Sequence, residues 1–213
     1  REVRVELASA YRVCALLGWS ELIYAHITAR VPGPEHHFLI NPYGLRWDEV
    51  TASNLIKIDV EGNAIKDGYA AGAPRYTANK AGFIIHSAVH MAREDAHAVM
   101  HLHTDAGVAV SCMKTGLLPL NQHALVVCDD VAHHEYEGVA LHLDERERLT
   151  ADLGAKHLML LWNHGTIGLG RTVAECFMRM YYFERACAIQ VAALAGGALH
   201  QPSAQSIDAF TTG

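Results

Sequence analysis

Two apolar runs that each end in histidine constrain the fold of this chain more than any other feature. Residues 98–103 read AVMHLH, and residues 158–165 read LMLLWNHG. Because alternate residues of a β-strand point to the same face, His101 and His103 are expected to lie side by side at a strand end. His164 follows the second run, and three neutral imidazoles around one open position are a common zinc arrangement. The pattern therefore predicts that His101, His103 and His164 bind one divalent metal ion.

The alternative for a His-x-His pair is that one ring faces solvent while the other is hydrogen-bonded within the sheet. The metal interpretation is favoured because the pair lies at the carboxyl end of its strand, where open α/β sheets bind ligands. Zinc is the first choice, with manganese or iron(II) as alternatives, because imidazole suits several transition metals.

Composition narrows the class of protein and its partners. The chain has 213 residues, 51% of them hydrophobic, which suits one large domain over residues 1–199 and a C-terminal tail over 200–213. A net charge of −6 without a Lys/Arg cluster argues against nucleic-acid and anionic-membrane partners. No apolar run is long enough to span a bilayer, and no signal peptide is visible. The five cysteines lack CxxC spacing, so reduced thiols and a cytoplasmic location are expected.

Apolar periodicity predicts short strands interleaved with helices. Helices are expected over residues 3–17, 79–93, 145–153 and 172–196, and strands over 26–31, 37–40, 55–60, 64–66, 98–103, 125–131 and 157–162. Thr104 is expected to cap a further helix. Residues 67–76 read as a loop, and residues 168–170 (GLG) as a turn. Several strand pairs read as hairpins, which indicates an α/β sandwich with a largely antiparallel or mixed sheet.

A second histidine pair, His86 and His90, has the helical spacing of a zinc peptidase. That class needs a glutamate directly after the first histidine as general base, and this chain has Ser87 there. Core histidines are therefore favoured over a peptidase site, although one ring could orient a metal ligand through its second nitrogen.

A polar segment over residues 132–138 offers candidate proton donors. It contains His134, Tyr136 and Glu137 within a few residues, and functional loops cluster such groups. A solvated loop is the equally weighted alternative. His26 and Thr28 share one face of another predicted strand, which by itself says little.

Further motifs extend along nearly the whole chain: residues 24–30 (YAHITAR), 51–55 (TASNL), 79–90 (NKAGFIIHSAVH), 116–119 (GLLP) and 136–138 (YEG), besides 101–104 (HLHT) and 163–165 (NHG). With them the chain resembles the class II aldolase/adducin family, most closely its adducin-like branch. Its sugar-phosphate aldolases, such as fuculose-phosphate aldolase, are the enzymes it resembles. The resemblance implies a three-layer α/β/α sandwich around a mainly antiparallel sheet, and a homo-oligomer, with a tetramer favoured.

The resemblance also implies roles for single residues. In the aldolases of this family three histidines bind zinc, and they match His101, His103 and His164. The glutamate that serves those enzymes as acid/base falls on Gly82 here, which cannot move a proton. The strand of the phosphate pocket reads Ala25 to Thr28, so the phosphate pocket is altered as well. The tyrosine contributed by a neighbouring subunit is replaced near Gln122 and His123.

Two main hypotheses follow. The first is a metal-dependent lyase that cleaves a carbon–carbon bond, by aldol chemistry or decarboxylation, through a metal-stabilised enolate of a small, non-phosphorylated hydroxy-carbonyl or carboxylate substrate. Proton-handling candidates are His26, first because it occupies the former phosphate strand, then His134, Tyr136, Glu137, and Gln122 with His123. The second is a non-catalytic adducin-like oligomerisation and binding module. A metal-dependent oxygenase or epimerase is a lesser alternative.

Overall fold

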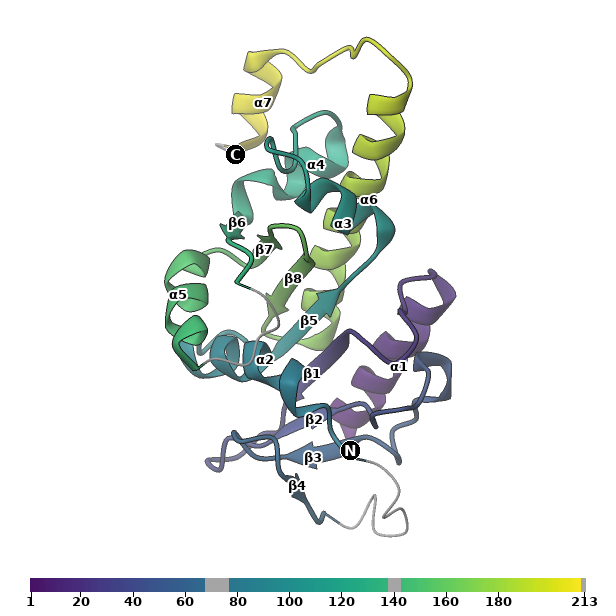
Figure 1. Cartoon of the computed structure of the whole chain (residues 1–213), viewed down its shortest axis with the longest axis vertical. Coiled ribbons are helices and arrows are strands. Elements are labelled where there is room, and N and C mark those ends of the chain that lie inside the picture. Colours follow the sequence, from purple (N-terminus) through teal and green to yellow (C-terminus); the bar gives the residue numbers. More distant parts are fainter. Residues whose placement is uncertain (68–76, 138–142, 212–213) are drawn as a thin grey trace.

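The computed structural model describes residues 1–67, 77–137 and 143–211 (Figure 1). Its helices are α1 (Glu2–Leu16), α2 (Lys80–Ala92), α3 (Asp105–Ser111), α4 (Gln122–Val127), α5 (Leu143–Leu153), α6 (Val173–Ala195) and α7 (Ala204–Thr211), with 3₁₀ turns η1 (Trp47–Glu49) and η2 (Cys128–Asp130). Its strands are β1 (His26–Arg30), β2 (Phe38–Ile40), β3 (Ile56–Ile58), β4 (Ala64–Ile65), β5 (Ala98–Leu102), β6 (Val131–His134), β7 (Leu158–Leu161) and β8 (Gly165–Gly170).

The strands form one mixed sheet in the order β4-β3-β2-β1-β5-β8-β7-β6. Every neighbouring pair is antiparallel except β6 and β7, which run parallel. The predicted antiparallel or mixed sheet is therefore confirmed. Strands β5 and β8 are neighbours in the interior of the sheet, which brings residues 98–103 next to residues 165–170.

Helices cover both faces of the sheet (Figure 1). Met100 and Leu102 of β5 share a core with Met180 and Phe183 of α6, and this core also includes residues of α1 and α3. Val99, which precedes Met100 and points to the opposite face, belongs instead to the core that contains residues of α2 and α5. The alternation of the strand thus builds two cores, one on each side, and gives the three-layer α/β/α sandwich.

The predicted strand over residues 125–131 is wrong. Residues 122–127 form helix α4, and the strand begins only at Val131. The apolar run LVV favoured a strand, but Asn121 caps the helix by accepting a hydrogen bond from the backbone N–H of Ala124 at 3.2 Å. Capping outweighed the β-propensity of the two valines.

The predicted turn at residues 168–170 is also wrong, because Gly168 and Gly170 lie within β8. A Cβ atom at Gly168 would lie 2.5 Å from the Met180 sulfur, and one at Gly170 would lie 2.5 Å from the backbone nitrogen of Cys176. The glycines therefore serve close packing of α6 on the strand rather than a turn.

Some of the predicted segments lie partly or wholly outside the residues that the structure describes. Residues 68–76 of the predicted loop lie outside the described residues, as does Gly138 at the end of the polar segment. The tail over residues 200–213 includes helix α7, which contacts α4. None of the described helices combines the length and apolar character that crossing a membrane requires.

Candidate metal centre

The three predicted histidines lie together at one end of the neighbouring strands β5 and β8. His101 is the next-to-last residue of β5, and His103 directly follows that strand. His164 occupies the turn between β7 and β8, just after Asn163, whose φ of 57° reverses the chain. Because Leu102 of β5 pairs with Thr166 of β8, the turn is held beside the end of β5.

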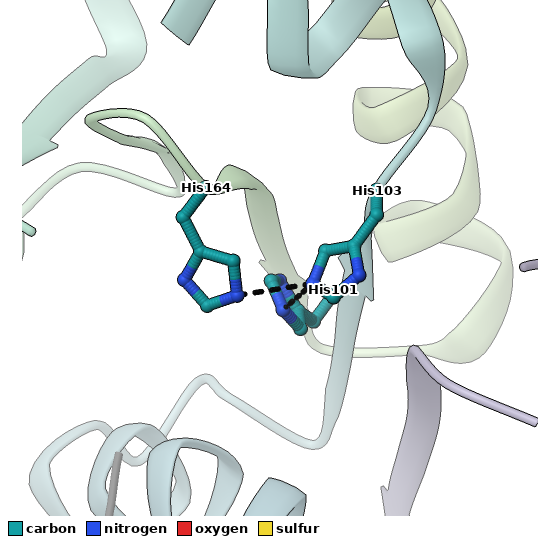
Figure 2. A group of neighbouring side chains, drawn as sticks. All are labelled: His101, His103 and His164. Carbon is teal, nitrogen blue, oxygen red and sulfur yellow. Dashed lines mark hydrogen bonds between the residues drawn. The ribbon is translucent and has the colours of Figure 1, made fainter. Parts of the chain in front are cut away.

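The ring nitrogens of the three histidines converge (Figure 2). The Nε2 atom of His103 lies 2.7 Å from Nε2 of His101 and 3.0 Å from Nε2 of His164. His101 is buried, while His103 and His164 are partly exposed. Each ring therefore presents one nitrogen to a common point that solvent can reach.

The partners of the other ring nitrogens identify the converging atoms as acceptors. Nδ1 of His101 lies 2.9 Å from the carbonyl oxygen of Thr166, and Nδ1 of His103 lies 2.6 Å from a carboxylate oxygen of Glu21. Since these oxygens only accept, each Nδ1 carries the proton and each Nε2 has a free lone pair. The contact between the Nε2 atoms of His101 and His103 thus joins two acceptors, and a cation between them removes the conflict. The donor set fits a divalent metal ion.

Burial keeps the rings in the form that binds metal. It lowers the pKa of His101 well below its usual range, and charge on the neighbouring histidines lowers it further. Burial and His103 lower the pKa of His164 to about 4, although Glu21 partly opposes this. Neutral imidazole is the ligand form, so near pH 7 no proton has to leave these two rings before a metal binds.

Gly165 explains why the third histidine is followed by glycine. A Cβ atom there would lie 2.4 Å from the carbonyl oxygen of Leu102 and 3.1 Å from the His103 ring. Any side chain would push the turn away from β5. The NHG segment is therefore the sequence that lets His164 approach His103.

His103 and His164 face an open depression of about 500 Å³. Its lining residues are Glu21, His103, Asp105, Val108, Ala109 and His164. A depression of similar volume near Arg12, Leu16 and Arg46 contains none of the three histidines. The chemistry of the side chains, rather than cavity size, assigns the site to the first of the two.

His26 lies directly against Gly82 of α2. A Cβ atom at Gly82 would lie 1.5 Å from Nε2 of His26, so the imidazole fills the space of a side chain at that position. The ring is buried, and neither of its nitrogens has a hydrogen-bond partner among the residues that the structure describes. Burial lowers its pKa to about 4. His26 is therefore a neutral ring beside the site, near His101, with no nitrogen exposed to solvent.

His86 and His90 are core residues in the structure. Thr28 Oγ1 lies 2.7 Å from Nδ1 of His86 and 2.7 Å from Nε2 of His90, and His90 Nδ1 donates to the carbonyl oxygen of Ala96 at 2.7 Å. No described hydrogen bond joins either ring to the three histidines. Thr28, to which the sequence assigned no role, connects the two rings of this buried network through its hydroxyl group.

This network predicts acid sensitivity. Burial lowers the pKa of His90 in the folded protein to about 3, against about 6.5 when unfolded, so its contribution to stability is complete above pH 6.5 and is lost as the pH falls. Between pH 7 and pH 5 the loss from this ring is about 2 kcal/mol. Urea unfolding of chelator-treated protein should show that His90→Gln loses about 2 kcal/mol less than wild type over this range. Equal losses in the two proteins would rule out His90 as the source.

The polar segment after β6 divides between two sides. The Tyr136 ring lies 6.1 Å from the His164 ring, centroid to centroid, and is 55% exposed, so it borders the site. His134 instead contacts Asp152 of α5 at 2.7 Å, and Glu137 accepts from Arg148 at 2.7 Å. Two of the three candidates therefore attach α5 to the sheet.

Gln122 and His123 lie on α4. Gln122 is exposed, and the His123 ring lies 5.8 Å from the Tyr182 ring of α6. Within the described residues no hydrogen bond or ring contact joins them to the three histidines. The family resemblance implies that they stand where a neighbouring subunit would contribute a tyrosine, and their role stays a prediction.

Two acidic residues of the site were not predicted from the sequence. Glu21 bonds His103 from the loop before β1, and because β1 pairs with β5 through His26 and His101, that loop ends beside the histidines. Glu184 lies on α6, where its spacing from Met180 and Cys187 places it on the buried stripe. A carboxylate on an apolar helix stripe is a signal that the sequence carried.

Comparison with known proteins identifies the family of this chain. The family model described as "Class II Aldolase and Adducin N-terminal domain" matches residues 5–191. A protein of Caulobacter vibrioides with a class 2 aldolase name is 60% identical over 196 residues, covering 92% of this chain and 74% of the relative. Alpha-adducin of Mus musculus is 44% identical over 194 residues, which are 91% of this chain and 26% of alpha-adducin.

Solved structures give the same fold. An aldolase II superfamily protein from Pseudomonas syringae is 48% identical with a TM-score of 0.93, over 99% of this chain and 84% of the other. L-fuculose 1-phosphate aldolase from Glaciozyma antarctica is 28% identical with a TM-score of 0.87, over 99% of this chain and 80% of the aldolase chain. The chain belongs to the class II aldolase and adducin N-terminal domain family.

Proposed function

We propose that this chain is a metal-dependent lyase that cleaves a carbon–carbon bond of a small, non-phosphorylated hydroxy-carbonyl or carboxylate substrate. The observation that carries the proposal is the convergence of one ring nitrogen from each of three histidines beside an open depression. His101, His103 and His164 would hold the metal, most simply zinc. The proposal includes a homo-oligomer, with a tetramer favoured, and a cytoplasmic location.

When bound, a divalent cation supplies Lewis-acid stabilisation of the negative charge on an enolate oxygen. In the aldol case, the bond between the carbon next to the carbonyl and the hydroxyl-bearing carbon breaks. The electron pair stays on the carbonyl fragment as an enolate, the hydroxyl proton passes to water, and an aldehyde or ketone leaves. Protonation of the enolate carbon from water completes the reaction. In decarboxylation, the same electron movement releases carbon dioxide, and water supplies the proton.

The charge of the depression supports a substrate without phosphate. Glu21 and Asp105 line it, and no described lysine or arginine does. Two carboxylates disfavour a phosphate dianion and give it no cationic partner. A neutral hydroxy-carbonyl or a single carboxylate bound to the cation is the better match.

Tyr136 is the solvent-exposed candidate beside the three histidines, since its ring borders His164 and is half exposed. Its hydroxyl would donate a hydrogen bond to the substrate oxygen that becomes charged. Such a bond is worth about 1.5–3 kcal/mol, so Tyr136→Phe should lower kcat/KM by about 10–100-fold. Zinc affinity should stay unchanged, and Tyr43→Phe, an exposed tyrosine without such a contact, should behave as wild type. Full activity of Tyr136→Phe would remove this role.

A binding module without catalysis is the second candidate. Two observations favour it: Gly82 cannot act as an acid, and alpha-adducin is 44% identical over this region. Zinc-loaded protein incubated with hydroxy-aldehydes, hydroxy-acids, keto acids and aromatic carboxylates separates the two, with cleavage products followed by NMR. The lyase proposal expects turnover that His103→Ala abolishes. Absence of cleavage across the panel by fully loaded protein would favour the binding module.

A further inference from the structure

Glu184 is a buried acid that the steps above do not use. It lies on α6, and its neighbours Met180, Phe183 and Cys187 belong to the core between α6 and the sheet. Its side chain is buried, and burial raises the pKa of its carboxyl group, while hydrogen bonds from Thr104 and Thr166 oppose that rise. A carboxylate in this place is costly unless its oxygens are fully partnered.

Both oxygens of Glu184 are partnered, and each partner belongs to a segment that carries candidate metal ligands. Oε2 accepts from the hydroxyl of Thr104, the residue after His103. Oε1 accepts from the hydroxyl of Thr166 at 2.5 Å, two residues after His164. One carboxylate thus connects the end of β5 to the start of β8.

The connection reaches all three histidines. The carbonyl oxygen of Thr166 accepts the Nδ1 proton of His101, which sets the orientation and tautomer of that ring. Thr104 also accepts from the backbone N–H of Gly107 at 2.9 Å, which begins α3. Displacing either threonine would therefore move a histidine.

The packing around Glu184 is fitted to this contact. A Cβ atom at Gly107 would lie 3.1 Å from both carboxylate oxygens and 3.0 Å from the Thr104 hydroxyl. Glycine at this helical position admits the carboxylate at close range. Leu102 shares the α6-side core with Glu184's neighbours, so the alternation of β5 turns His101 toward the opposite face, and Glu184 supports the histidines from behind the sheet.

We propose that Glu184 is a positioning residue of the metal centre, which holds the His103 and His164 segments at the separation that one cation requires. The inference rests on the proposed metal site and deepens it. Direct partners of metal ligands typically contribute 10–100-fold to metal affinity, and Glu184 acts on the histidines through Thr104 and Thr166, so Glu184→Ala should weaken zinc binding by about 10-fold. Glu184→Gln keeps an acceptor for one threonine and a donor for the other, and should stay within about threefold of wild type.

The test is a zinc titration of metal-free protein against a competing chelator, with cobalt absorption as a second readout of ligand geometry. Gln190→Ala is the matched control, because Gln190 is equally buried on α6 and bonds the backbone of Leu118 and Gly116 instead. The control should lose stability but keep its zinc affinity and cobalt spectrum. Thr166→Val removes one of the two hydroxyl groups that donate to Glu184 and should also weaken zinc binding. This variant tests the inference if Glu184→Ala does not fold.

Three results would overturn the inference: zinc affinity of Glu184→Ala or, if that variant does not fold, of Thr166→Val within threefold of wild type; an equal loss in Gln190→Ala; or an equal loss in Glu184→Gln. The last result would assign the effect to charge instead of position. If wild type binds zinc no better than His103→Ala, the metal site itself fails and the inference falls with it. If wild type binds tightly and Glu184→Ala binds as well, only the inference fails.

Discussion

Gly82→Ala is expected to destabilise the protein by about 3 kcal/mol, although the same change in an ordinary helix stabilises by about 1 kcal/mol. The reason is the 1.5 Å separation between a Cβ atom at this position and Nε2 of His26. His26 has no room to withdraw, because it is buried between His86 and His101. Urea unfolding of the two proteins measures the difference.

A double-mutant cycle assigns the cause. In a His26→Ala background the obstructing ring is gone, so Gly82→Ala should cost little, and the coupling between the two sites should be about 2–3 kcal/mol. Gly82→Glu, which places in this chain the acid that the family resemblance implies, should be tolerated only in that background. Additive effects of the two substitutions would show that the ring and the glycine do not exclude each other.

Removing one histidine of the triad should have the largest effect on metal binding. Structural zinc sites with four ligands bind with about 10–16 kcal/mol, so one ligand is worth roughly 3 kcal/mol, or on the order of 100-fold in affinity. His101→Ala, His103→Ala and His164→Ala should each weaken zinc by at least that factor. His200→Ala, an exposed histidine near the C-terminus, is the control and should bind as wild type.

The three single variants should agree with one another because each removes one donor from the same point. A variant that keeps wild-type affinity would show that its ring is not a ligand. Loss of affinity in the His200→Ala control would show that zinc binds histidines nonspecifically. The three variants would then give no evidence that His101, His103 and His164 form one site.

The sequence was sufficient to predict the strand that carries His101, because an apolar run of this length is typical of a buried strand and is too short for a helix. Prediction from the sequence failed at two segments, for different reasons. Residues 122–127 carry strand-favouring valines, yet the side chain of Asn121 caps a helix there. Gly168 and Gly170 suggested a turn, but glycine is required at these positions by the close packing of α6. That helix is distant in sequence, so no local pattern reveals the requirement.

The candidate site was predictable to the same degree. His101 and His103 follow from strand periodicity and His164 from its place after a second apolar run, whereas Glu21 required the pairing of β1 with β5, which no local pattern specifies. His26 was selected for its strand, and the structure adds that its ring occupies the space above Gly82. Neighbours across the sheet, rather than neighbours along the chain, determined what the sequence alone could not give.

The central claim is that three imidazoles bind one cation, and anomalous diffraction at the zinc edge of zinc-loaded crystals tests it most directly. The account predicts a single peak about 2.0–2.1 Å from the Nε2 atoms of His101, His103 and His164, with Nδ1 of His103 still bonded to Glu21. Rings that remain joined only to protein or water, with no peak between them at full zinc loading, would contradict it.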